Sequence, residues 1–583
     1  MSTNPMRNVL VNGNKLFRTF NAARGLSVSP NESGTKILKS PRRDVEIPKQ
    51  TIPEYVFQRM EQFSKYIAFE CSITKRNYTF GEVRTKCRNL SKALRKKLKL
   101  QKRDTVALYI PNIPEFPIAT LGCLEAGLVV TTINALYTPD EISRQLKDSS
   151  TKAVITIPEM YENVTVAIEK LQKKLPIICI NTQSGQSLPQ GAINFNEFAN
   201  NVIDIPDFEN AEASDLAFLP YSSGTTGLPK GVELSHSNIV SNLAQFNVPE
   251  INFMEQTTDS FQEVTPAVLP MFHIYGFTVT TLNMLVNGVK VITLPKFTPE
   301  LYVDVLRNND VSMLFVAPPL LLFLSENPSV KEEYFRSLKV VLCGAAPLGA
   351  LDEERFIHKA KKNVYLLQGY GLTETSPVIA MTTRDIKEKL REKTEGSIGV
   401  PLPNTQIKIA NVNDLSGKPL GPNESGELLV KGPQVMRCYH NNPKATEEIF
   451  LDGWLRTGDL AHYDDFGLLF ITDRVKELIK VKGFQVAPAE LEEVIRDFPT
   501  VGDAAVIGIP HKEHGEVPRA YVVPRTKDDN INLEELNSFV NEKVAKYKQL
   551  RGGVQIVSEI PKNAAGKILR RQLKLKFQSE NIK

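Results

Sequence analysis

Along the chain, short apolar runs alternate with amphipathic stretches. Thr105–Ile110 and Leu128–Thr132 are continuous runs of apolar and β-branched residues, which predict buried strands. Pro114–Glu125 and Thr138–Lys147 have helical spacing, and Thr138 is a good N-cap residue for the second helix. Strands that alternate with helices form parallel sheets covered by helices. This part of the chain is therefore predicted to have an α/β fold.

The same alternation returns around Leu269–Leu294 and Ser312–Val341, and it stops near Gly396. From there, short apolar runs are separated by Gly, Pro and Asn turns, which is typical of a small β-rich subdomain. Beyond Arg474 the pattern predicts a compact α+β unit that begins with a helix at Pro488–Asp497. We therefore expect a tail over 1–44, a large part of βα subdomains with the β-rich subdomain over 45–474, and a small α+β C-terminal domain over 475–583.

Composition narrows the class of protein. Of the 583 residues, 42% are hydrophobic and 23% are charged, as in ordinary globular proteins, and the net charge of +5 is too small to imply a nucleic-acid partner. The cysteines form no CxxC pair and the histidines form no HExxH motif, so we expect no metal bound by Cys or His. Val264–Val289 has no charged residue, but its prolines and polar residues argue against a transmembrane segment. Peripheral contact with a membrane is left open.

The N-terminal residues differ from the rest of the chain. Met1–Asn31 contains four basic residues and no acidic one, interspersed with leucines and phenylalanines. That composition is typical of a mitochondrial transit peptide, and an unstructured tail is the alternative. We expect a mitochondrial location, with a cytoplasmic location as the alternative. The chain does not end in the peroxisomal Ser-Lys-Leu signal.

The segment Tyr221–Gly231 (YSSGTTGLPKG) has the composition of an anion-binding loop. Its glycines allow close approach of the backbone, its hydroxyls are donors, and its lysine supplies a positive charge. A generic surface loop would have a similar composition. It lacks the Gly-Lys-Ser/Thr ending of the common phosphate-binding loop. The candidate ligands for phosphate are Ser222, Ser223, Gly224, Thr225, Thr226, Gly227 and Lys230.

Five further segments follow this loop in a fixed order. They are Gly344–Pro347 (GAAP), Gln368–Thr375 (QGYGLTET), Gly453–Asp459 (GWLRTGD), Asp473–Gln485 (DRVKELIKVKGFQ) and Pro561–Lys567 (PKNAAGK). Together with the loop, they resemble the motifs of the adenylate-forming superfamily. The chain is most similar to 4-coumarate–CoA ligases and related acyl-CoA synthetases, from about Tyr78 to Leu573. The resemblance implies activation of a carboxylic acid by ATP to an acyl-AMP, followed by transfer to coenzyme A.

The resemblance also assigns roles around ATP. The loop would hold the β- and γ-phosphates, Glu374 would bind Mg²⁺, Thr373 would contact the α-phosphate, and Tyr370 would stack on adenine. Asp459 would bind the ribose hydroxyls, and Arg474 would contact the ribose or a phosphate. The rest of the adenine slot would be formed by Gly344, Ala345, Ala346, Pro347, Gln368, Gly369 and Gly371.

Two half-reactions would use opposite edges of the small domain. Lys567 matches the family lysine that reaches the carboxylate and the α-phosphate during adenylation. Lys480 and Gln485 match residues that reach the site during thioester formation. One small domain cannot present both edges at once, so the family pattern implies a mobile domain that rotates about a hinge at Lys476.

The acyl pocket has the weakest sequence signal of the site. His273 matches a residue that closes the tunnel shared by the acid and pantetheine, although a core histidine is a common alternative. Further expected wall residues are Tyr275, Gly344, Gly369, Pro377 and Val378. The acid is expected to be a fatty or an arylpropenoic acid, and the sequence does not separate these classes.

Three other functions remain open at this point. The chain could adenylate an acid for a carrier protein, act as a luciferase-like oxygenase, or bind acyl groups or nucleotides without catalysis. Few residues follow Lys567, which favours CoA over a carrier domain in the same chain. The presence of all the charged motif residues favours an enzyme.

Overall fold

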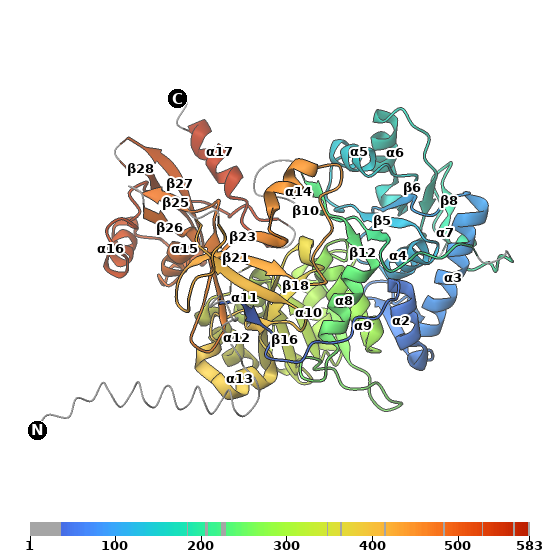
Figure 1. Cartoon of the computed structure of the whole chain (residues 1–583), viewed down its shortest axis with the longest axis horizontal. Helices are drawn as coiled ribbons and strands as arrows, with labels where there is room; N and C mark the ends of the chain where they lie inside the picture. The colour runs from blue at the N-terminus through green and yellow to red at the C-terminus, as the bar shows by residue number, and fades with distance from the viewer. Residues whose placement is uncertain are drawn as a thin grey trace, which may run out of the picture.

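The computed structural model describes residues 36–580, apart from 184, 205–207, 223–228, 347, 362–363, 413–415, 482–483, 513, 527–528 and 564–565 (Figure 1). The molecule has the predicted division into a large α/β body, a β-rich sheet and a small C-terminal α+β unit. Residues 1–35, on which the transit peptide prediction rests, lie outside the described part. Within that part, no helix has the length and apolar character needed to cross a membrane.

A seven-stranded sheet forms the first layer of the body. Its order is β12-β9-β5-β4-β6-β7-β8. The strands from β4 to β9 run parallel to one another, as the alternating pattern predicts, and β12 is antiparallel to β9. Its strands are β4 (Thr105–Leu108), β5 (Val129–Thr132), β6 (Ala153–Thr156), β7 (Ile177–Cys179), β8 (Ile193–Asn194), β9 (Leu216–Phe218) and β12 (Leu234–Ser235). The helices of this region are α2 (Ile52–Met60), α3 (Phe80–Lys97), α4 (Glu115–Glu125), α5 (Pro139–Asp148), α6 (Tyr161–Lys170), α7 (Phe195–Ala199) and α8 (His236–Phe246).

Two further sheets complete the body. One has the order β13-β14-β2-β3 and the other β15-β16-β17-β18-β19. Their strands are β2 (Ile67–Cys71), β3 (Asn77–Thr79), β13 (Val264–Ala267), β14 (Lys290–Thr293), β15 (Met313–Val316), β16 (Val340–Cys343), β17 (Tyr365–Gly371), β18 (Val378–Met381) and β19 (Val400–Pro401). The helices are the π-helix η3 (Tyr275–Leu282), α9 (Asn283–Val286), α10 (Pro299–Asn308), α11 (Pro318–Glu326), α12 (Ala350–Ala360), the 3-10 turn η5 (Thr373–Thr375) and α13 (Arg384–Leu390). The uncharged stretch that begins at Val264 is thus a buried strand followed by helices, as predicted.

The β-rich sheet corrects the expected boundary of the tail. Its order is β1-β20-β21-β23-β22, with β24 paired to β23. Its elements are β1 (Leu38–Lys39), β20 (Gln406–Ala410), β21 (Gly426–Lys431), α14 (Pro443–Ile449), β22 (Phe450–Leu451), β23 (Trp454–Tyr463) and β24 (Leu469–Arg474). Leu38 pairs with Ile407 and is buried, and Arg42 forms an ion pair with Asp385. A tail extending to residue 44 is therefore wrong, because the folded body already includes residues from Leu38 onward.

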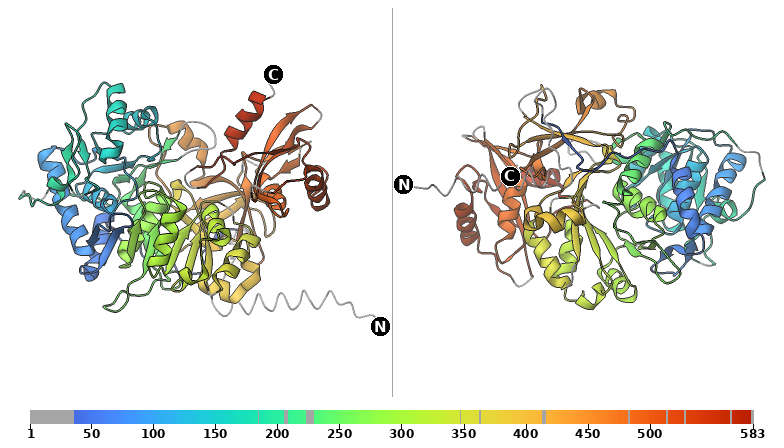
Figure 2. Two further views of the ribbon diagram at one scale, coloured as in Figure 1. Left: turned by 180° about the vertical axis from the view of Figure 1, so that it is seen from behind. Right: turned by 60° about the horizontal axis from the view of Figure 1, so that its bottom comes forward.

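The C-terminal unit has its own sheet and core. The sheet order is β26-β25-β28-β27, with β29 paired to β28. Its elements are β25 (Ile479–Val481), β26 (Phe484–Val486), α15 (Pro488–Arg496), β27 (Val501–His511), β28 (Gly515–Pro524), α16 (Leu533–Lys543), β29 (Val554–Ile556) and α17 (Arg570–Glu580). Leu491, Val506 and Leu536 are among its buried core residues. Figures 1 and 2 place this unit at the opposite end of the long axis from α2 and α3.

Candidate active site

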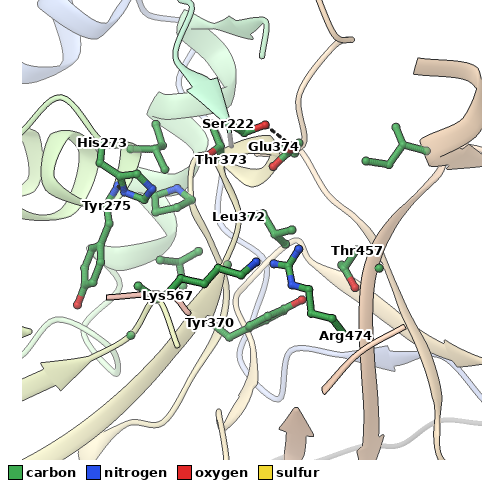
Figure 3. Close-up of a pocket in the computed structure, with 18 of the residues that line it drawn as sticks. Ser222, His273, Tyr275, Tyr370, Leu372, Thr373, Glu374, Thr457, Arg474 and Lys567 are labelled. Atoms are coloured by element: carbon green, nitrogen blue, oxygen red, sulfur yellow. Dashed lines mark hydrogen bonds between the residues drawn. The ribbon is translucent and has the colours of Figure 1, made fainter. Parts of the chain in front are cut away.

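A cavity of about 660 Å³ lies where the body, the β-rich sheet and the C-terminal unit meet (Figure 3). Its wall is formed by residues of the two strands that flank the glycine-rich loop, of α8, η3 and η5, and of β16, β17 and β18. The β-rich sheet and α14 contribute another side, and Asn563 and Lys567 come from the C-terminal unit. All six motif segments therefore supply described residues to one cavity, and the Gly453–Asp459 segment does so through Arg456, Thr457 and Gly458.

The ends of the glycine-rich loop are held by a small hairpin, β10 (Tyr221–Ser222) and β11 (Lys230–Gly231). The hydroxyl of Tyr221 donates a hydrogen bond to Asp148 at 2.6 Å, which ties the hairpin to α5. A Cβ at Gly231 would lie 3.1 Å from the ring of Tyr221, so a glycine lets the ring lie against the backbone there. Ser222 and Lys230 line the cavity, as predicted for phosphate ligands. The candidates Ser223, Gly224, Thr225, Thr226 and Gly227 lie outside the described residues.

Glu374 provides the carboxylate next to this hairpin. It is 7% exposed, and its Oε1 accepts hydrogen bonds from Ser222 Oγ at 3.2 Å and from Tyr439 Oη at 2.7 Å. Within the described residues, no cluster of three or more His, Cys, Asp or Glu side chains forms a metal site. One carboxylate suits Mg²⁺, which usually takes one or two carboxylates and completes its shell with phosphate oxygens and water. Glu374 therefore fits the predicted role as ligand of a Mg²⁺ ion bound with ATP.

Tyr439 was not predicted from the sequence. It is 6% exposed and lines the cavity, and burial raises the pKa of its hydroxyl, with the Glu374 carboxylate as the second cause. The hydroxyl therefore remains a donor at neutral pH. No motif surrounds this residue in the sequence, and a tyrosine between Cys438 and His440 carries no periodic signal.

Asp459 and Arg474 lie opposite each other on β23 and β24. Arg474 Nε lies 2.7 Å from Asp459 Oδ1, and the Tyr370 hydroxyl donates to Asp459 Oδ2 at 2.6 Å. Asp459 is 3% exposed and does not line the cavity itself. Its two partners, Tyr370 and Arg474, do line the cavity. A carboxylate oxygen can accept more than one hydrogen bond, so Asp459 can still accept from the ribose hydroxyls. The structure therefore brings Asp459 and Arg474 together, and Tyr370 binds the same carboxylate.

Lys567 reaches into the cavity from the loop before α17. Figure 3 shows its ammonium and the guanidinium of Arg474 converging from opposite sides. Burial, and then the charge of Arg474, lower the pKa of Lys567 to about 8. The neighbouring Gly566 has φ +81°, and a Cβ there would lie 2.9 Å from Pro319, which belongs to the body. This glycine lets the loop pack closely on the body and so places the lysine.

The other edge of the C-terminal unit faces elsewhere. Lys480 is an exposed residue of β25, opposite Gln485 on β26, and it is not among the described residues that line the cavity. The backbone position of Gln485 is described, but its side chain is not. Lys476 lines the cavity in the linker between β24 and β25. In this arrangement Lys567 lines the cavity and Lys480 does not, as expected for the adenylation step. The rotation of the C-terminal unit stays a prediction.

Asp473 connects the two domains beside this linker. Its Oδ2 accepts a hydrogen bond at 2.8 Å from the backbone N–H of Ala489, in the first turn of α15. Its Oδ1 accepts from Arg474 N at 2.6 Å. Burial raises the pKa of Asp473 to about 7, although the nearby Arg570 charge opposes this shift. The carboxylate therefore caps a helix of the C-terminal unit from the last strand of the body.

The predicted acyl-pocket residues line one end of the cavity. His273, Tyr275, Gly344, Gly369, Pro377 and Val378 are all present there, together with Phe246, Ile274, Leu342 and Met381, which the sequence did not single out. Tyr275 N donates to His273 Nδ1 at 3.3 Å, and burial lowers the pKa of His273 to about 4, so the ring is neutral at neutral pH. The Tyr275 hydroxyl donates to the carbonyl of Leu342 at 3.0 Å.

Other predicted positions around adenine are placed differently. Thr373, Gly344, Ala345, Gly369, Tyr370 and Gly371 line the cavity, and Pro347 lies outside the described residues. Gln368 is buried, its side-chain amide points to Glu353 at 3.5 Å, and it does not line the cavity. Ala346 does not line it either. The backbone N–H of Gln368 donates to Thr382 Oγ1 at 2.7 Å, which ties this strand to the residue after β18.

These features define an adenylate-forming enzyme. A family model described as AMP-binding enzyme matches residues 56–440, and the AMP-binding enzyme C-terminal domain matches residues 490–567. The chain belongs to the AMP-binding enzyme family. It is 36% identical to 4-coumarate–CoA ligase 2 of Solanum tuberosum over 555 residues, which cover 95% of this chain and 98% of that protein. The probable 4-coumarate–CoA ligase 3 of Dictyostelium discoideum is 34% identical over 554 residues, 93% of this chain and 98% of that protein.

Solved structures agree with this assignment. ATP-bound MatB from Rhodopseudomonas palustris matches with a TM-score of 0.80 at 26% identity, over 91% of this chain and 99% of that one. The o-succinylbenzoate CoA synthetase MenE from Bacillus subtilis, in complex with its acyl-adenylate, matches with a TM-score of 0.73 at 28% identity, over 90% of this chain and 98% of that one. The protein is an AMP-forming acid–thiol ligase. It activates a carboxylic acid with ATP as an acyl-AMP and transfers the acyl group to CoA.

Proposed function

We propose that the acid is a monocarboxylic acid with an apolar tail, either an alkyl chain or an arylpropenoyl group. The observation that supports this is the composition of the acyl end of the cavity. Among the described residues, the lining contributed by α8, η3 and β16–β18 contains no charged side chain. Removing a second carboxylate from water without a partner costs several kcal/mol or more, so such a wall disfavours dicarboxylic acids. The names of the 4-coumarate–CoA ligase relatives are consistent with an aryl tail.

The charged groups at the other end would carry out the adenylation. Ser222 and Lys230 would hold the β- and γ-phosphates, and Thr373 the α-phosphate. Glu374 would bind Mg²⁺, which neutralises charge on the pyrophosphate as it leaves. Lys567 would hold the carboxylate beside the α-phosphate, so that a carboxylate oxygen forms a bond to the α-phosphorus while the bond to pyrophosphate breaks. Positioning and charge neutralisation are the main contributions of the protein to this step.

Thioester formation would follow rotation of the C-terminal unit about Lys476. Lys480 and Gln485 would then replace Lys567 at the site, and the CoA sulfur would attack the acyl carbon and release AMP. Neutral His273, which lines the cavity, would close the tunnel without adding charge to it.

A panel of acids tests the proposed substrate class. Pyrophosphate and AMP release would be measured with ATP, Mg²⁺ and CoA for alkanoic acids of increasing length, cinnamic acids, benzoic acids and matched dicarboxylic acids. We expect apolar monocarboxylic acids to have the highest kcat/KM and dicarboxylic acids of equal length to be poor substrates. A dicarboxylic acid as the best substrate would contradict the proposal. Acyl-AMP that forms but transfers only to a carrier protein, or is oxidised, would favour the alternatives that the sequence left open.

We also propose that the basic N-terminal tail directs the enzyme to mitochondria. The support is the acid-free, basic composition of Met1–Asn31. Import of the full chain into isolated mitochondria, compared with a variant in which Arg7, Arg18 and Arg24 are glutamine, tests this. Equal import of both chains, or no import of either, would contradict it.

A further inference from the structure

Tyr439 lies between the two groups that are expected to hold the phosphate end of ATP. The ammonium of Lys230 lies 4.8 Å from the centre of the Tyr439 ring, which is a cation–π distance. On the other side, the Tyr439 hydroxyl donates to Glu374 Oε1 at 2.7 Å. One side chain therefore contacts both the lysine of the glycine-rich loop and the carboxylate of the QGYGLTET motif.

The hydrogen bonds at Glu374 are unevenly distributed between its two oxygens. Ser222 and Tyr439 both donate to Oε1. No donor among the residues that the structure describes reaches Oε2. When hydrogen bonds hold one oxygen of a carboxylate, the other oxygen is directed toward a cation in a fixed orientation. Hydrogen-bond partners of metal ligands commonly orient the ligands in this way.

The backbone around Tyr439 is tied to both neighbours. Tyr439 forms a β-bridge with Val232, just after Lys230, and Met436 N donates to the carbonyl of Glu374 at 2.8 Å. Tyr439 N is in turn bonded to Thr446 Oγ1 at 3.0 Å. The ring is thus held by a backbone that is already connected to the loop and to the carboxylate.

We propose that Tyr439 is a positioning residue that sets the direction of Glu374 and the place of the Lys230 ammonium together. Its hydroxyl fixes the carboxylate for a divalent cation, and its ring fixes the lysine for phosphate. The proposal rests on the roles proposed above for Glu374 and Lys230. Tyr439 would thereby couple the binding of the cation to the binding of the ATP phosphates.

Two substitutions separate the functions of the side chain. Tyr439→Phe removes the hydroxyl and keeps the ring, whereas Tyr439→Leu removes both. Tyr463→Phe is a matched control, because Tyr463 is fully buried outside the cavity and its hydroxyl donates to the carbonyl of Leu420 at 3.2 Å. Thermal unfolding of all three variants shows whether loss of a buried hydroxyl alone explains an effect.

The cation is measured directly with Mn²⁺ as the probe. Electron paramagnetic resonance gives the affinity of Mn²⁺ for the enzyme–ATP complex, without acid or CoA, and calorimetry gives the affinity of ATP in EDTA. We expect Tyr439→Phe to weaken Mn²⁺ binding by about tenfold or more, as for other partners of metal ligands, with ATP affinity in EDTA unchanged. Tyr439→Leu should also weaken ATP binding in EDTA, by about two- to fivefold. The control should match the wild type in both assays.

Glu374→Gln distinguishes failure of this inference from failure of the assigned metal ligand. If Glu374→Gln lowers Mn²⁺ affinity and Tyr439→Phe does not, the positioning role of Tyr439 is wrong and the ligand assignment stands. If neither substitution changes Mn²⁺ affinity, the assigned role of Glu374 fails as well. If Tyr439→Phe weakens ATP binding equally with and without the cation, the hydroxyl has no specific effect on Glu374.

Discussion

Lys567 provides the most direct pH test of the adenylation step. Its pKa is lowered to about 8 by burial and by the charge of Arg474. A lysine with a lowered pKa is charged below that value and loses its charge as the pH rises through it. Lys567 would be about 90% protonated at pH 7, half protonated at pH 8 and about 10% protonated at pH 9.

The kcat/KM for ATP in acid-dependent ATP–pyrophosphate exchange reports the free enzyme. We expect it to be flat below about pH 7 and to fall with an apparent pKa near 8, by about tenfold for each further pH unit. Under saturating ATP, the phosphates favour the charged lysine, so the fall in kcat should move to higher pH. Loss of one preorganised charge at a transition state costs about 10²–10³ in rate, so Lys567→Ala should lose at least that factor at pH 7.

The Lys567→Arg variant is the matched control for this assay. Arginine stays charged throughout the range, so its profile should lack the fall near pH 8 even if its rate at pH 7 is reduced. Arg474→Gln should move the fall to higher pH, because a neighbouring positive charge is removed. An identical fall in the wild type and in Lys567→Arg would refute the assignment of this limb to Lys567.

Three further results are expected. Lys567→Ala should abolish formation of acyl-AMP and spare thioester formation from supplied acyl-AMP, and Lys480→Ala should do the reverse; equal loss of both half-reactions, measured separately, would contradict domain alternation. Asp473→Asn replaces one of the two carboxylate oxygens that accept from Ala489 N and Arg474 N, so adenylation should fall by about three- to tenfold while thioester formation is retained; unchanged adenylation in a single-turnover assay would count against the cap. Gly369→Ala adds a Cβ that meets its nearest side chain at 3.5 Å, so it should fold normally and lower kcat/KM for long or aryl acids more than for acetate.

Local sequence signals predicted much of the fold. Thr138 is the N-cap of α5, accepting a hydrogen bond from Glu141 N in a complete capping box, as its position before the amphipathic stretch indicated. The boundary of the tail was missed because β1 has only two residues and is stabilised by pairing with β20, far away in the sequence. Such short strands have no periodicity of their own.

The site was predictable where residues belong to a motif. Lys567, Glu374 and Arg474 were found in that way, and the structure brings them to one cavity. Tyr439 was not found, because its function depends on a hydroxyl–carboxylate contact between residues 65 positions apart, which neither spacing nor composition reveals. Gln368 shows that a residue inside a motif need not line the cavity, since its side-chain amide is directed to Glu353.

The measurement that tests the central claim most directly is AMP release by the purified enzyme with ATP, Mg²⁺, CoA and a panel of acids matched in length but different in tail charge. The account predicts release that requires the acid, with a higher kcat/KM for apolar monocarboxylic acids than for their dicarboxylic counterparts. Release that is independent of the acid, or that is fastest with a charged tail, would contradict it.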